Sequence, residues 1–131
     1  VTMHTRTTVE LRAKYADLDR TFGLIALFRT PTQGQFSMIL FDAGPGPAQV
    51  ILMNDQDEEV DCPGLKHRVD IDRDLAVVQI PRGCLRDPAW VRIGAGSSLD
   101  AGSDGTYVDD PRLDGRVNTK SPVFGPRLAA G

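Results

Sequence analysis

The sequence predicts an all-β protein that folds as a two-sheet antiparallel β-sandwich, immunoglobulin-like or jelly-roll-like, with about seven strands and an extended C-terminal tail. Short apolar runs with a two-residue period recur along the first two thirds of the chain. Clusters of Gly, Pro, Asn and Asp separate these runs. Almost no segment is expected to form a regular helix.

The first two predicted strands show the two patterns that sandwich strands can have. From Thr7 to Tyr15, apolar Val9, Leu11 and Ala13 alternate with charged residues, which predicts one buried and one solvated face. From Phe22 to Phe28 the chain is apolar on both faces, as expected for a central strand.

Five further strands complete the predicted sandwich. They cover Gln35 to Phe41, Ala48 to Met53, Leu65 to Ile71, Leu75 to Ile80 and Ala89 to Ala95. A tight helical turn is expected at Gly83 to Pro88, because Pro81 and Pro88 punctuate both ends of that segment.

We place the sandwich domain in residues 1–110 and a basic, proline-containing extension in residues 111–131. Two interpretations of the tail remain open: a loosely held extension, or an arm that docks on a partner with Val123, Phe124 and Leu128 as apolar anchors. Val1 and Met3, at the start of the chain, are candidates for the same role. Neither end is expected to bury much on its own domain.

Composition narrows the classes of partner. The chain has 15 basic and 18 acidic residues, so it lacks the basic footprint of a nucleic-acid-binding protein. Apolar runs such as Met38 to Phe41 are far shorter than the roughly 20 residues that span a bilayer, so we expect no membrane insertion. The N-terminus lacks the layout of a signal peptide, which suggests either that a signal was removed or that this is part of a gene product.

The only two cysteines, Cys62 and Cys84, bracket a predicted strand hairpin. They are spaced neither as a redox Cys-x-x-Cys pair nor as a complete zinc set, so a structural disulfide is the favoured interpretation. A disulfide of this kind indicates secretion into an oxidising environment.

Four segments carry a resemblance to known proteins. They are Asp17-Leu18-Asp19-Arg20, Val60-Asp61-Cys62, Ile80 to Leu85 followed by Pro88 to Arg92, and Tyr107 to Asp110. Together they resemble a group of small secreted proteins of actinobacteria. The resemblance implies an exported, disulfide-bonded β-sandwich, in a group whose members mostly have no assigned activity. Some small extracellular sandwiches of actinobacteria act as adaptors in secreted toxin particles.

Acidic and aromatic residues suggest two ligand classes. Asp55, Asp57 and Glu59 recur at every second position, which makes a calcium site a candidate, although the run lacks the glycine of an EF-hand loop. The alternative is a solvated turn. Trp90 is either a core residue or an aromatic on a binding face.

Catalytic motifs are lacking. The two histidines, His4 and His67, belong to no recognisable catalytic motif and are expected at the surface or at a strand edge. The sequence therefore favours a non-enzymatic extracellular adaptor that binds another protein, with a subunit of a secreted toxin particle as one form of it. A sandwich that binds carbohydrate or cell wall, with or without calcium, is the alternative, and a hydrolase is third.

Overall fold

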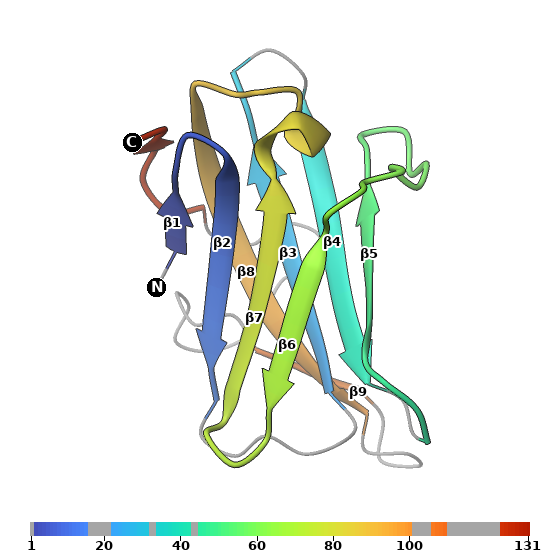
Figure 1. Cartoon of the computed structure of the whole chain (residues 1–131). Coiled ribbons are helices and arrows are strands. Elements are labelled where there is room, and N and C mark those ends of the chain that lie inside the picture. Colours follow the sequence, from blue (N-terminus) through green and yellow to red (C-terminus); the bar gives the residue numbers. More distant parts are fainter. Residues whose placement is uncertain (1, 16–21, 32–33, 43–44, 101–105, 110–123) are drawn as a thin grey trace.

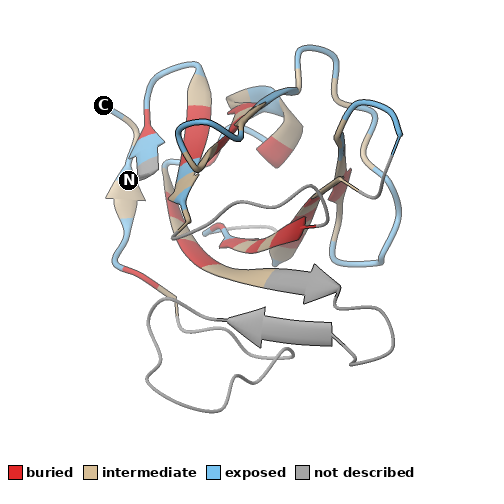
Figure 2. Cartoon of the chain, turned by 90° about the horizontal axis from the view of Figure 1, so that it is seen from below, coloured by how far each residue is buried: buried red, intermediate tan, exposed pale blue. Residues whose placement is uncertain are grey.

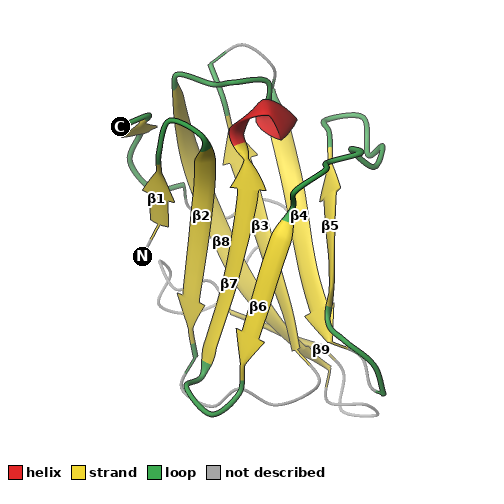
Figure 3. Ribbon diagram, viewed as in Figure 1, coloured by secondary structure: helices red, strands yellow, loops and turns green. Residues whose placement is uncertain are grey.

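The chain folds into two antiparallel β-sheets that pack face to face (Figure 1). This computed structural model describes residues 2–15, 22–31, 34–42, 45–100, 106–109 and 124–131. Within those ranges the one helix is a short 3-10 turn, η1, at Arg82–Leu85 (Figure 3). No helix in the described part of the chain is long and apolar enough to cross a bilayer. The predicted all-β sandwich is confirmed.

The smaller sheet has the spatial strand order β1-β2-β7-β6. These strands are β1 (Thr2–His4), β2 (Thr8–Lys14), β7 (Leu75–Pro81) and β6 (Lys66–Asp70). The larger sheet has the order β10-β8-β3-β4-β5, and β9 also pairs with β8. Its strands are β10 (Leu128–Ala129), β8 (Trp90–Asp100), β3 (Phe22–Arg29), β4 (Gln35–Asp42), β5 (Gln49–Met53) and β9 (Thr106–Asp109).

This strand order is that of a variable-type immunoglobulin sandwich. In that fold, strands A, B, E and D make one sheet, and strands G, F, C, C′ and C″ make the other. Here β1, β2, β7 and β6 take the first set of places, and β9, β8, β3, β4 and β5 take the second. The topology therefore supports the immunoglobulin-like form of the prediction over the jelly-roll form.

The core lies between the two sheets, and Figure 2 shows buried positions on the strands that surround it. Phe28, Met38 and Leu40 from the larger sheet are fully buried there, together with Val9 and Val78 from the smaller one. Full burial of one such side chain stabilises the fold by roughly 1.5–3 kcal/mol. These contacts join strands that are far apart in the sequence.

Every predicted strand is present. The observed bounds lie within one residue of the predicted ones, except that β8 continues to Asp100 instead of ending at Ala95. The predicted helical turn corresponds to η1. Three strands were missed, namely β1, β9 and β10, and they are only 3, 4 and 2 residues long. A two-residue period cannot be recognised in such short segments.

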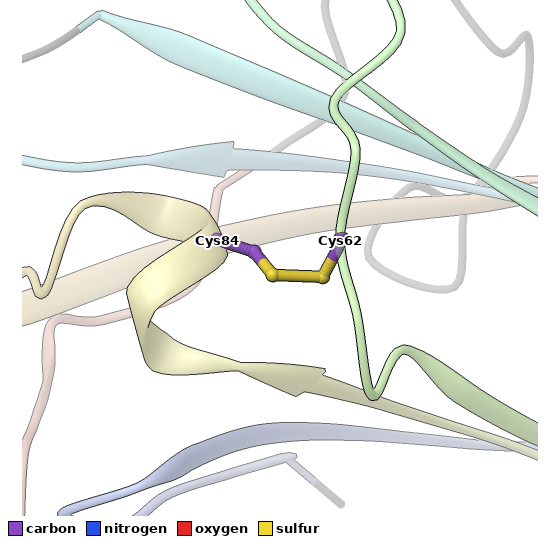
Figure 4. The surroundings of a disulfide bond; sticks show 2 residues. All are labelled: Cys62 and Cys84. Carbon is purple, nitrogen blue, oxygen red and sulfur yellow. A yellow bond between two sulfur atoms is a disulfide. The ribbon is translucent and has the colours of Figure 1, made fainter.

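Cys62 and Cys84 form the predicted disulfide, with Cα atoms 5.6 Å apart (Figure 4). Cys62 lies between β5 and β6, and Cys84 lies on η1 between β7 and β8. Both connections pass from one sheet to the other, so the bond ties the two crossings together. In antibody domains, by contrast, the disulfide joins strands B and F directly.

The C-terminal residues return to the sandwich. Leu128 pairs with Val91 and Ala129 with Trp90, and the Gly125 amide donates to the Ile93 carbonyl at 2.9 Å. Leu128 also packs against the core. Residues 124–131 are therefore part of the sandwich, so the expected start of a separate tail at residue 111 is wrong for them. Residues 110–123 lie outside the described ranges.

The two chain ends meet and close one side of the sandwich. The Gly131 amide donates to the His4 carbonyl at 3.1 Å, and the His4 ring Nδ1 lies 2.8 Å from the Leu128 carbonyl. His4 is only 7% exposed. His4 lies on the edge strand β1, which fits the strand-edge alternative of the prediction and not the surface one. The expectation that neither end buries much on its own domain is wrong, because a contact across 124 residues of sequence buries the ring.

Replacing both Cys62 and Cys84 with serine should lower the free energy of unfolding by ~3 kcal/mol, because the unfolded chain is no longer restricted by a loop closed over 22 residues. Urea unfolding of the native chain and the double variant measures the difference. Intact mass before and after reduction and alkylation is the control for bond formation. Equal unfolding midpoints would show that the bond adds no stability.

Deleting residues 124–131 should lower the free energy of unfolding by ~2 kcal/mol or more, because the deletion removes the β10 pairing and the burial of Leu128. Thermal or urea unfolding tests this. The exposed Pro126, replaced by alanine, provides a control that should unfold like the native chain. A deletion variant with an unchanged free energy of unfolding would support the interpretation of these residues as a loosely held extension.

Candidate functional site

The outer side of the larger sheet carries three rows of residues in register. The central row is Gly96, Ile25, Ile39 and Ile51, on β8, β3, β4 and β5. The neighbouring rows are Gly94, Leu27, Ser37 and Met53, and Ser98, Gly23, Phe41 and Gln49. Residues opposite each other in a sheet project to the same side, so each row forms one band across four strands.

We call the six large apolar residues of these rows the apolar face. They are Ile25, Leu27, Ile39, Phe41, Ile51 and Met53. All six are half-buried, whereas most of the alternate residues of the same strands are buried in the core. The three rows contain no Asp, Glu, Lys or Arg. A solvated face of an antiparallel sheet normally carries polar residues, so this face has the composition of a contact surface.

Two arginines mark one end of the apolar face. Arg29 and Arg92 lie opposite each other on β3 and β8. The Arg29 guanidinium stacks 4.0 Å from the centre of the Phe124 ring, and Arg92 Nε donates to the Gly125 carbonyl at 2.8 Å. Both cations therefore hold the C-terminal segment in place.

The aromatic side chains do not form a platform for sugars. Trp90 is half-buried beneath the Arg127 guanidinium, 4.4 Å from its ring centre, so it is neither a core residue nor a free binding aromatic. Phe124 is covered by Arg29 in the same way. Tyr15 packs edge-on against Phe22, with ring centroids 5.7 Å apart. These three rings are thus engaged within the chain.

The outer side of the smaller sheet differs in character. A shallow depression of about 380 Å³ there is lined mainly by polar and charged residues, including Glu10, Arg12, Gln79, Lys66 and Arg68. The buried Glu10 carboxylate accepts hydrogen bonds from Gln79 Nε2 at 2.7 Å and from Arg12 Nε. Charged residues such as those on the edge strand β6 protect a free edge from pairing with other chains, which is a structural reason for this charge.

The pKa of Glu10 lies below its usual range, because hydrogen bonds from Gln79 and then from Arg12 stabilise its ionised form. Arg68 adds a weaker attraction. The carboxylate therefore stays charged in this network and links β2 to β7 on the outer side of the sheet.

The acidic run that suggested calcium forms a turn. Asn54 Oδ1 accepts from the amides of Gln56 and Glu58, at 2.9 and 3.0 Å. Asp55, Asp57 and Glu59 are all exposed around this turn. Within the described ranges, no three His, Cys, Asp or Glu side chains come together as a group that could hold a metal ion. The turn interpretation thus has direct support and the calcium interpretation has none.

The predicted partner-binding residues have separate positions. Met3 lies on β1 and is 45% exposed, on the same side of the smaller sheet as Glu10. Phe124 contacts Arg29, and Leu128 contacts the core. Val1 and Val123 lie outside the described residues. The structure therefore does not bring these five residues into one surface.

The apolar face is not predicted by the sequence pattern alone. The chain was recognised as apolar on both faces from Phe22 to Phe28, but the alignment of β4 and β5 with this strand depends on register. Ile39 and Ile51 lie in two of the predicted strands, and apolar residues occupy both alternating sets of positions there. This two-sided apolar pattern is the sequence signal for the apolar face.

A scan against known protein families found none that matches this chain, and a search of curated proteins found no match either. Function therefore has to be inferred from the surfaces of the chain itself. The apolar face and the charged depression are the two candidates, and they lie on opposite outer sides of the sandwich.

Replacing Glu10 with glutamine should reduce stability at pH 7 and make unfolding less dependent on acid. A lowered folded pKa stabilises the fold above the unfolded value of about 4.3, and this contribution disappears as pH falls through the folded pKa. The two proteins should therefore differ in the free energy of unfolding at pH 7 and converge at acidic pH, below the folded pKa of Glu10. Urea unfolding across that range measures this, and a constant difference would contradict it.

Proposed function

We propose that this chain is a non-enzymatic, secreted protein-interaction module that docks through the apolar face. The partner surface is an uncharged, apolar face of another folded protein. The observation that carries this proposal is the band of Ile25, Ile39 and Ile51 on the solvent side of the larger sheet, in rows without a charged residue.

The composition of the apolar face fits a protein partner. The buried centre of a protein interface is depleted in charged residues and enriched in large apolar ones, and a polar rim surrounds it. Leu27, Phe41 and Met53 extend the apolar area on both sides of the isoleucines, while Gln35 and Gln49 stand at its margin. Large apolar residues gathered on the solvent side of a folded domain are typical of an interaction site.

The rest of the fold makes this face rigid. The core residues Phe28, Met38 and Leu40 hold the inner sides of the same strands, and the disulfide ties the connections between the sheets. A preformed face loses little conformational entropy when it binds. The disulfide also supports secretion, because such bonds persist in oxidising compartments.

The apolar face replaces the chain ends as the proposed contact. Phe124 and Leu128, which sequence reasoning offered as anchors for a partner, are engaged within the chain. For carbohydrate, calcium or hydrolytic chemistry, no arrangement of the described residues gives comparable support. The module therefore acts as an adaptor through a sheet face and not through an extended arm.

Replacing Ile39 with aspartate should weaken partner binding at least about tenfold, because the change places a charge at the centre of an apolar contact. A photo-reactive residue at position 53 captures the partner, which is then identified and purified. Its affinity for the native chain and the variant is measured by titration calorimetry.

Ile71→Asp is the matched control. Ile71 lies in the turn between β6 and β7 and is 42% exposed, so the same chemical change there should leave both folding and affinity unchanged. Thermal unfolding must show that Ile39→Asp is still folded. An Ile39→Asp variant that is folded and binds the captured partner as tightly as the native chain would overturn the proposed function.

A further inference from the structure

We infer that the partner of the apolar face is a second copy of this chain, docked face to face about a twofold axis that runs along the strands between β3 and β4. The inference rests on the proposed function and adds the identity of the partner. Its basis is the shape of the face, which the register defines residue by residue.

The two outer strands of the face differ in height. On the β8 side the rows contribute Gly94 and Gly96, which have no side chain. On the β5 side they contribute Ile51 and Met53. The β8 edge of these two rows is therefore low and the β5 edge is high, whereas the two inner strands mix large and small residues.

A twofold axis along the strands makes the apolar faces of two copies complementary in shape. Rotation about that axis keeps each row level with the same row of the second copy and reverses the order of the strands. Gly96 of one copy then faces the second copy's Ile51, and Gly94 faces its Met53. The high β5 edge of each copy thus lies over the low β8 edge of the other.

On the inner strands β3 and β4, large residues also face small ones across the axis. Leu27 faces Ser37 of the second copy, and Gly23 faces its Phe41, so a large side chain meets a small residue in both rows. In the central row Ile25 faces Ile39, which forms the apolar centre of the contact. An isologous contact of this kind buries the same surface on both copies, as twofold dimers require.

Charge permits this contact. The chain has a net charge of −3, so two copies repel weakly at a distance. The three rows carry no charge, so facing copies bring no like charges together at the interface. Identical sheets have the same twist and can pack with their strands nearly aligned.

The size of the face sets the strength of the dimer. Four strands about 4.8 Å apart and three rows about 7 Å apart give the face a footprint of roughly 400 Å² on each copy. A stable interface of standard size buries about 800 Å² on each partner, including its polar rim. We therefore expect a reversible dimer that forms as the protein is concentrated.

Sedimentation equilibrium of the full chain tests the second copy. The native mass should rise with concentration from 14.3 kDa toward twice that value. Ile71→Asp should behave in the same way, and Ile39→Asp should stay monomeric while remaining folded in thermal unfolding. A native chain that stays monomeric at every concentration up to millimolar would overturn the inference.

Cysteine cross-linking tests the arrangement. The double variant Gly96→Cys with Ile51→Cys should form covalent dimers with a short bis-maleimide, because the two positions face each other between copies. Within one chain they are separated by three strand spacings, about 14 Å, which disfavours cross-linking by a short reagent. Each single variant should cross-link poorly, since its own position lies far from the same position on the second copy.

The outcomes separate the inference from the proposed function. Covalent dimers formed as readily by either single variant as by the double variant would overturn the proposed axis. A monomeric native chain whose captured partner is a different protein, with binding lost in Ile39→Asp, would overturn the second copy and leave the proposed function standing. A monomer whose captured partner binds Ile39→Asp normally would overturn both.

Discussion

The two-residue period of the pleated strand is the constraint on which this structure depends. Once Phe22, Leu24, Ala26 and Phe28 of β3 turn inward to fill the core, the residues between them must face outward. Those residues include Ile25 and Leu27, so this strand carries apolar side chains on its outer side as well as in the core. The core and the candidate binding face therefore both include residues of the same short segment.

The connections between the sheets depend on that core as well. The chain crosses from one sheet to the other between β5 and β6 and again between β7 and β8, and the Cys62–Cys84 bond joins these crossings. Leu85, next to Cys84 on η1, is almost completely buried. The helical turn thus anchors the bond to the core, and the bond limits the separation of the sheets in the unfolded chain.

Local pattern predicted the seven longer strands and the disulfide, because alternation and cysteine spacing are properties of short segments. It missed β1 and β10, whose stability comes from partners far away in the sequence, such as Leu128 opposite Val91. It allowed His4 a strand edge, where β1 places it, but did not show that the C-terminal residues cover the ring. The apolar face needed the register between three strands, which aligns Ile25, Ile39 and Ile51, and no local pattern contains that register.

The two outer sides of the sandwich provide an internal comparison. Both belong to antiparallel sheets whose inner sides fill the same core, yet the smaller sheet carries Glu10, Arg12, Lys66 and Arg68 on its outer side or free edge. The fold thus accommodates charged residues on the solvent side of a sheet, and packing does not force the outer rows of β3, β4 and β5 to be apolar. Leaving large apolar side chains in water gains nothing for an isolated domain. The absence of charge from those three rows is therefore better explained by a contact that covers them than by the requirements of folding.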